Sequence, residues 1–195
     1  MALVKMKKLL DQAETEGVGI GAFSVGNMEM IMGAVQAAEE LQTPIILQIA
    51  EVRLKNSPLE FVGPMMVSAA QKAKVDIAVH LDHGLTMETV KAALNMGFTS
   101  VMLDASTSPF EENISKTQEV VQLAKTFGAT VEAELGLVGG SEDGSSDRGI
   151  NCTNPSDAKV FVEQTGIDAL AIAIGNAHGN YPVAPRLQFE VLKAI

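Results

Sequence analysis

Histidine and carboxylate side chains lie close together at one point of the sequence, His80-Leu81-Asp82-His83. In an extended strand, His80 and Asp82 project from the same face, and His83 just beyond the strand can turn back toward them. Imidazole nitrogens and carboxylate oxygens placed in this way can bind one small ion or substrate. The alternative is a hydrogen-bonded histidine at a strand end followed by an aspartate that caps a helix. The third histidine of the chain, His178, also follows an apolar run, and this coincidence favours a functional group.

Two glutamates, Glu132 and Glu134, alternate with apolar residues and therefore point the same way from a strand that we expect to be buried. An unpaired negative charge at such a position costs several kcal/mol, so a cation should lie beside them. A lysine or arginine partner and a divalent metal are both open at this point. Asp104, which follows the preceding apolar run, favours the metal.

The segment 136–154 is rich in glycine and longer than most connections between a strand and a helix. Its length and composition are typical of a mobile lid over a site. Glu142 and Asp143 lie on it. They would carry protons when the lid closes, or they would be solvated loop charges.

Short aliphatic runs rich in β-branched residues alternate with longer segments of helical period, which predicts an α/β fold with a parallel sheet covered on both faces. The expected strands are 18–23, 45–49, 77–81, 100–103, 130–135 and 169–174. The histidines and acids described above, together with Ser24, Gln48 and Glu51, follow or end these runs. Because ligands bind at the carboxyl ends of parallel strands, we expect these groups to share one rim.

Three helices are expected to begin at a polar cap followed by proline: Ser57-Pro58, Ser108-Pro109 and Asn154-Pro155. Three glycines, Gly97, Gly128 and Gly166, are expected to end helices in the left-handed conformation.

One βα unit takes roughly 30 residues of this chain, and an eight-unit barrel needs roughly 250. The 195 residues supply about six units. The chain is therefore either an open doubly wound sheet or the first six units of a (β/α)8 barrel that stops before strands seven and eight. In the second case residues 1–195 are one barrel domain whose first and sixth strands lack partners, and expressed alone it should be insoluble or inactive.

The composition excludes several classes of function. Fourteen basic residues against 24 acidic ones give a net charge of −10, which leaves no basic field for nucleic acid or anionic lipid. One cysteine and no long apolar run indicate a cytoplasmic protein without a disulfide or a membrane span. Gly19-Ile-Gly21-Ala-Phe-Ser24 begins like a dinucleotide fingerprint, but serine replaces its third glycine, and the helix begins only after Asn27.

In these motifs the chain resembles the class II, metal-dependent fructose-bisphosphate and tagatose-bisphosphate aldolases. The similar segments are Ala22-Phe-Ser-Val-Gly-Asn-Met-Glu29, His80-Leu-Asp-His-Gly84, Met102-Leu-Asp-Ala-Ser106, the run from Val131 to Gly144, and Ile174-Gly-Asn-Ala-His-Gly179. The resemblance implies a (β/α)8 TIM barrel that cleaves a phosphorylated ketose reversibly to dihydroxyacetone phosphate and an aldehyde, as a glycolytic lyase does. It also implies a homo-oligomer.

The resemblance assigns roles to single residues. His83 and His178 would bind one catalytic Zn2+, whose Lewis acidity stabilises the enediolate. Asp82 would move the proton at the C4 hydroxyl of the ketose, and Glu142 on the lid would exchange the proton at C3.

Further residues would line the site. Gly179 would contact the dihydroxyacetone phosphate unit, and Asp104 with Glu134 would line a position for a second cation, divalent or monovalent. Ser24 stands where the family usually has asparagine in the lining around the sugar. The family's third zinc histidine and its main phosphate-binding loops belong to strands seven and eight, which this sequence does not contain.

Two other functions use the same residues. A barrel metallohydrolase would use the metal to activate water, and a non-catalytic aldolase-like protein would keep a ligand or structural role. Asp82 beside His83, together with the glutamate on the lid, favours the lyase. The absent third histidine favours the protein without catalysis.

Overall fold

The computed structural model of the chain describes residues 2–140, 149–181 and 184–195. Within them one parallel sheet has six strands, β1 (Gly21–Ser24), β2 (Ile45–Ala50), β3 (Ile77–Gly84), β4 (Ser100–Leu103), β5 (Thr130–Leu135) and β6 (Ala169–Ile172). The helices are α1 (Met6–Glu16), α2 (Met28–Leu41), α3 (Leu59–Lys72), α4 (Met87–Asn95), α5 (Phe110–Phe127), α6 (Pro155–Thr165) and α7 (Phe189–Ala194), with a 3-10 helix η1 (Glu51–Arg53). In these ranges no helix is long and apolar enough to cross a membrane.

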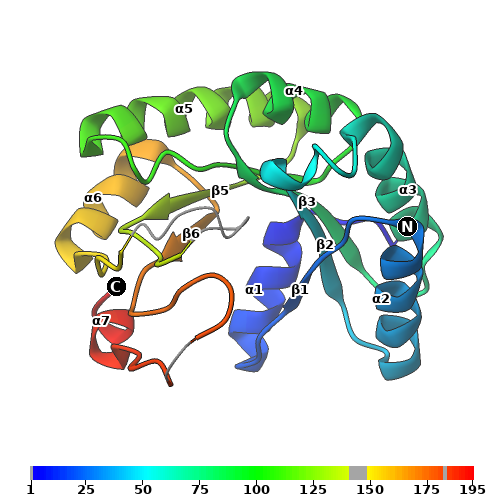
Figure 1. Cartoon of the computed structure of the whole chain (residues 1–195), viewed down its shortest axis with the longest axis horizontal. Helices are drawn as coiled ribbons and strands as arrows, with labels where there is room; N and C mark the ends of the chain where they lie inside the picture. Colours follow the sequence, from blue (N-terminus) through cyan, green and yellow to red (C-terminus); the bar gives the residue numbers. More distant parts are fainter. Residues whose placement is uncertain (1, 141–148, 182–183) are drawn as a thin grey trace.

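The strands lie side by side in chain order, β1 to β6. A doubly wound sheet reverses its strand order at a switch point, whereas a barrel winds in one direction. Helices α2 to α6 form an outer arc around the sheet (Figure 1). The chain thus has six units of a TIM-barrel-like fold, and the doubly wound alternative is wrong. As expected, β1 and β6 are the two edges of the described sheet.

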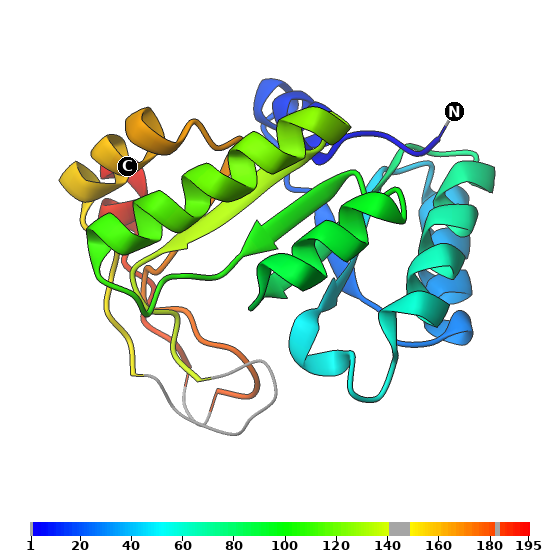
Figure 2. The same cartoon turned by 90° about the horizontal axis from the view of Figure 1, so that it is seen from above.

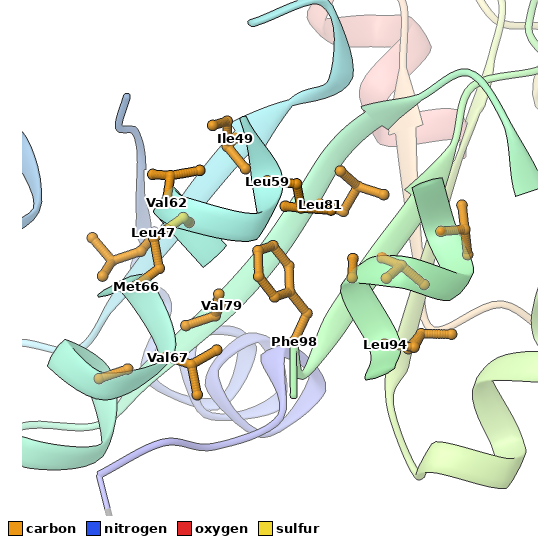
Figure 3. Packing of buried hydrophobic residues seen from close by; sticks show 14 of the residues in the cluster. Leu47, Ile49, Leu59, Val62, Met66, Val67, Val79, Leu81, Leu94 and Phe98 are labelled. Carbon is orange, nitrogen blue, oxygen red and sulfur yellow. The ribbon is translucent and has the colours of Figure 1, made fainter. Parts of the chain in front are cut away.

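The outer face of the sheet is apolar because the helices pack on it. Leu47 and Val79 project outward from β2 and β3 and contact Val62 and Met66 of α3 (Figure 3). All four are at most 2% exposed. Each such side chain stabilises the fold by about 1.5–3 kcal/mol relative to an exposed one, before entropy is counted.

The expected cap at Asn154 is confirmed, since its side chain accepts a hydrogen bond from the Ser156 backbone at the start of α6. The caps expected at Ser57 and Ser108 are wrong, because α3 and α5 begin one residue later and have proline at the cap position. The Ser57 hydroxyl donates instead to the Gly26 carbonyl, 2.6 Å away. Positive φ angles are found at all three glycines expected near helix ends, Gly97, Gly128 and Gly166.

The inner face of the sheet is closed at one end by α1. Met6 and Leu9 of this helix pack against Ile46 of β2 and Ala78 of β3. Figure 2 shows α1 at one end of the sheet, with η1 and the residues just after β6 at the other end. In the described residues, α1 therefore covers the amino ends of β2 and β3 on the inner face, and the carboxyl ends of the strands lie opposite to it.

A polar layer lies on the inner face between α1 and those carboxyl ends. His80 is 1% exposed, and its Nδ1 lies 2.8 Å from the Ser100 hydroxyl. Its Nε2 lies 3.2 Å from a carboxylate oxygen of Glu132, although not in the alignment of a hydrogen bond. Burial alone would raise the pKa of Glu132, but His80 holds that pKa below its usual range. The side chain that lies beside Glu132 is thus a histidine, and not the lysine, arginine or metal that the sequence left open.

A β-bulge interrupts the pairing of β3 with β4. Leu81 pairs with Val101 and Gly84 pairs with Leu103, so β3 carries one extra residue between these pairs. His83 sits in the bulge with φ +40°. Such a backbone costs about 1–3 kcal/mol in a residue other than glycine and persists only where the surroundings impose it.

Gly84 allows the bulge because it has no side chain. A Cβ at this buried position would lie 2.5 Å from the Met102 carbonyl oxygen. We therefore expect Gly84→Ala to lower the free energy of unfolding by about 2 kcal/mol or more, measured by urea denaturation. Gly33→Ala is the matched control, since a Cβ at that exposed helical position meets nothing within 4 Å. It should be neutral or stabilise by about 0.5–1 kcal/mol. Equal effects of the two changes would contradict this account of the bulge.

The contact between His80 and Glu132 predicts that substitutions of these two residues have coupled effects on stability. His80→Leu should lower the free energy of unfolding by about 2 kcal/mol, because Glu132 then keeps a buried charge without its partner. The expected loss in the free energy of unfolding is smaller than for a fully buried pair, since the Glu132 side chain is 24% exposed. His80→Leu combined with Glu132→Leu should recover at least about 1 kcal/mol, because no lone charge is left. Additive losses in this double-mutant cycle would show that the two side chains are not coupled.

Candidate active site

The bulge in β3 turns the imidazole of His83 toward the end of β4. His83 Nδ1 lies 3.1 Å from Asp104 Oδ2, although Asp104 comes one residue after the last residue of β4. Both side chains are nearly enclosed, at 12% and 3% exposure. A regular strand would alternate side chains between its two faces, so the extra residue decides where His83 points.

Asp104 is held in place by the turn that follows it. Its other oxygen, Oδ1, accepts hydrogen bonds from the backbone N–H of Ser106 at 3.0 Å and from the Ser106 hydroxyl at 2.6 Å. An aspartate side chain commonly accepts hydrogen bonds in this way from the residue two positions after it. With Oδ1 occupied in this way, Oδ2 is presented to His83.

Glu134 of β5 completes a compact group with His83 and Asp104. One donor atom from each of the three residues lies within 4.8 Å of the others. Glu134 is 4% exposed, and its backbone carbonyl accepts a hydrogen bond from the buried Asn113 side chain of α5. The ring of His178 stands edge-on to that of His83, with centroids 5.0 Å apart.

Several carboxylates lie close together in this group, and their charges shift the pKa values of its members. Burial alone would lower the pKa of His83, but the hydrogen bond that its Nδ1 makes to Asp104 and the charges of Asp82, Asp104 and Glu134 raise it to about 9. Burial would raise the pKa of Asp104, yet His83 and Ser106 hold it well below its usual range. Burial and the charge of Asp104 raise the pKa of Glu134 to about 7. At neutral pH the site thus retains a proton on His83 and part of one on Glu134.

This donor set fits a divalent cation. One imidazole nitrogen and two carboxylate oxygens are ligands that zinc and other first-row metals accept. Burial and the nearby charge of Asp104, which raise the pKa of Glu134, both disfavour a bare carboxylate at this position. A bound cation would replace the protons that the site now holds.

Asp82 lies beside this group without joining it. Its Oδ1 is 3.9 Å from His83 Nε2, and its Oδ2 accepts a hydrogen bond from the Gln48 side chain at 2.8 Å. The same Gln48 nitrogen lies 3.3 Å from the Ser24 hydroxyl. A carboxylate in this position can exchange a proton with a molecule bound at the adjacent group.

The remaining sequence predictions have mixed outcomes. Glu132 points to the layer below with His80 and is not part of the group at the rim. Gly179 directly follows His178 with φ +76° and open space where a Cβ would be. Glu142 lies outside the described residues.

Sequence reasoning missed two residues that position the site. Ser106 follows Asp104 by two residues, and that spacing is a local signal that could have identified it. The sequence predicts that Gln48 lies at the rim, at the end of its strand. No local signal in the sequence shows that its side chain donates a hydrogen bond to Asp82 on the neighbouring strand.

Comparisons with known proteins place the chain among aldolases of known sequence and structure. Residues 4–195 match the family model described as fructose-bisphosphate aldolase class-II. A fructose-bisphosphate aldolase of Giardia intestinalis is 46% identical over 182 residues, and one of Thermus caldophilus is 45% identical over 181 residues. The crystal structure of the YdjI aldolase of Escherichia coli K12 superposes with a TM-score of 0.87 at 40% identity, over 98% of this chain and 67% of that one.

The matches with these two sequence relatives cover nearly all of this chain but a smaller share of each relative. The matches include 93% and 92% of this chain but only 56% and 59% of the Giardia and Thermus proteins. The chain thus spans somewhat more than half the length of these relatives. Its matched residues include all six strands and the described side chains of the site. The chain belongs to the class II fructose-bisphosphate aldolase family.

Proposed function

We propose that the whole protein is a metal-dependent lyase. It cleaves the C3–C4 bond of a phosphorylated ketose, similar to fructose or tagatose 1,6-bisphosphate, to dihydroxyacetone phosphate and an aldehyde. The observation that carries this proposal is the placement of Asp82 beside a buried group of metal-ligand type, 3.9 Å from His83. Family membership supports the reaction class.

His83 and His178 would hold the catalytic cation, zinc by this proposal, through their imidazole nitrogens. Asp104 and Glu134 would hold a second position for a cation. A cation bound there supplies a Lewis acid that polarises the carbonyl of the ketose. The nearness of the two imidazole rings and the negative charge around them support this assignment.

Asp82 would act on the hydroxyl at C4. It accepts the hydroxyl proton as the C3–C4 bond breaks, so that C4 becomes the carbonyl carbon of the aldehyde and the bonding electrons stay with the dihydroxyacetone phosphate half. The hydrogen bond from Gln48 to Oδ2 holds one oxygen of Asp82, and the other remains on the side of His83. The return of a proton to C3 is assigned to Glu142 by the family resemblance.

A cytoplasmic location and assembly into a homo-oligomer stay predictions from the sequence. Neither depends on the site described here.

The metal assignment predicts the zinc content of single variants. His83→Ala and His178→Ala should each bind zinc at least about tenfold more weakly, because losing a ligand costs at least as much affinity as losing a residue that hydrogen-bonds to a ligand. His80→Gln is the matched histidine control and should keep its zinc, since His80 is bonded to Ser100 in the layer below. Metal analysis after dialysis against a zinc buffer measures this directly. Undiminished zinc in both alanine variants would refute the assignment.

The lyase proposal predicts release of dihydroxyacetone phosphate from at least one sugar in a panel of ketose monophosphates and bisphosphates, followed by a coupled assay. Asp82→Ala should lower this rate by at least about a hundredfold, the usual range for a positioned acid or base. The variant should keep most of its zinc, because Asp82 is a proton carrier in this proposal. No release from any sugar by the wild-type protein would contradict the lyase. Loss of zinc in Asp82→Ala would contradict the role of this residue.

A further inference from the structure

The chain returns to the sheet just before α6, at the carboxyl ends of β5 and β6, which lie side by side (Figure 1). The backbones of Leu137 and Asn151 form an antiparallel bridge, with N–H to carbonyl distances of 2.8 and 3.0 Å. Two residues later, the Thr153 N–H donates to the carbonyl of Ala173 at 2.8 Å. Ala173 directly follows β6. The returning segment thus lies between the ends of the two strands.

The side chain of Thr153 connects the two strand ends. It is 2% exposed. Its hydroxyl donates a hydrogen bond to the carbonyl of Leu135, the last residue of β5, and accepts one from the N–H of Ala173 at 2.9 Å. Each of these backbone groups would lose a buried partner if the hydroxyl were removed, which is costly. One side chain therefore fixes the end of β6 relative to the end of β5.

Gly136 makes room for this contact. It directly follows β5 and has φ +92°. A Cβ at this position would lie 2.7 Å from the Thr153 hydroxyl oxygen and 2.9 Å from the Asn151 carbonyl oxygen. Because glycine has no side chain and adopts a positive φ easily, the chain can turn away after β5 and leave this place to Thr153.

The chain from the end of β6 to His178 is short and hydrogen-bonded. His178 follows Ala173 by five residues. Between them, the Ile174 N–H donates to Oδ1 of the Asn176 side chain at 2.8 Å. The N–H of His178 itself donates to the carbonyl of Gly139, also at 2.8 Å. A displacement of the end of β6 would therefore be transmitted to the backbone of His178.

We infer that Thr153 is a positioning residue for the metal group: by fixing the end of β6, it holds the imidazole of His178 beside that of His83. The two ring centroids are 5.0 Å apart. This inference rests on the proposed function, in which both histidines hold the catalytic cation. Thr153 acts through the backbone of His178. Residues that orient a metal ligand typically contribute about 10- to 100-fold to metal affinity.

The first test measures the zinc affinity of the whole protein by competition with a chromophoric chelator. Thr153→Val keeps the size of the side chain but removes the hydroxyl, and its Kd for zinc should rise at least about tenfold. Thr153→Ser keeps the hydroxyl and should bind zinc nearly as tightly as the wild-type protein. If Thr153→Val does not fold, Thr153→Ala replaces it, because water can enter the space and bond the two backbone groups without fixing them.

A matched control separates positioning from a general loss of stability. Thr130 is a threonine at the amino end of β5, 1% exposed, whose hydroxyl accepts a hydrogen bond from the Lys7 backbone. Thr130→Val should lower the urea midpoint as Thr153→Val does, but it should leave zinc binding unchanged. With Co2+ in place of zinc, Thr153→Val should alter the visible absorption bands, which depend on ligand geometry, whereas Thr130→Val and Thr153→Ser should keep them.

A double-mutant cycle with His178→Ala shows whether Thr153 acts through that histidine. In the His178→Ala background, Thr153→Val should weaken zinc binding by less than about twofold further, because the ligand that it positions is already absent. The same fold-loss in both backgrounds, or unchanged zinc affinity in Thr153→Val, overturns the inference, while weak zinc binding by His178→Ala alone keeps the metal assignment. Undiminished zinc in His178→Ala refutes the metal assignment, and the inference fails with it.

Discussion

The extra residue in β3 is the constraint on which the site depends. It gives His83 a left-handed backbone and directs its imidazole to Asp104. The close approach of Gly84 to the Met102 carbonyl allows the bulge, and pairing on both sides of it holds the bulge in register. The core packed on the outer face supplies the stability that offsets the strained backbone.

The inner face of the sheet becomes more polar from the amino ends of the strands to their carboxyl ends. Met6 of α1 packs against apolar side chains at the amino ends of the strands. His80 and Glu132 lie in contact in the next layer. Among the described residues, the acids of the candidate metal group gather at the carboxyl ends, where Glu134 lies close to Asp104 and His83.

The carboxyl edge of the sheet has two separate regions. The ends of β3, β4 and β5 carry the acidic group around His83, while the loop after β2 brings Arg53 to a separate cavity. Gln48 links the two regions through hydrogen bonds to Asp82 and Ser24.

The sequence by itself determined the six strands, their parallel direction and the rim on which the polar residues gather, because buried apolar runs and the alternation of side chains are local patterns. The order of the strands, which separates a barrel from a doubly wound sheet, is a property of the tertiary structure. It also placed His83, Asp104 and Glu134 correctly at that rim. Only the tertiary structure decided that Glu132 pairs with His80 in the layer below, since this depends on the register between neighbouring strands. The bulge and the contact of Gln48 with Asp82 also depend on backbone and side-chain packing across strands, which no local pattern encodes.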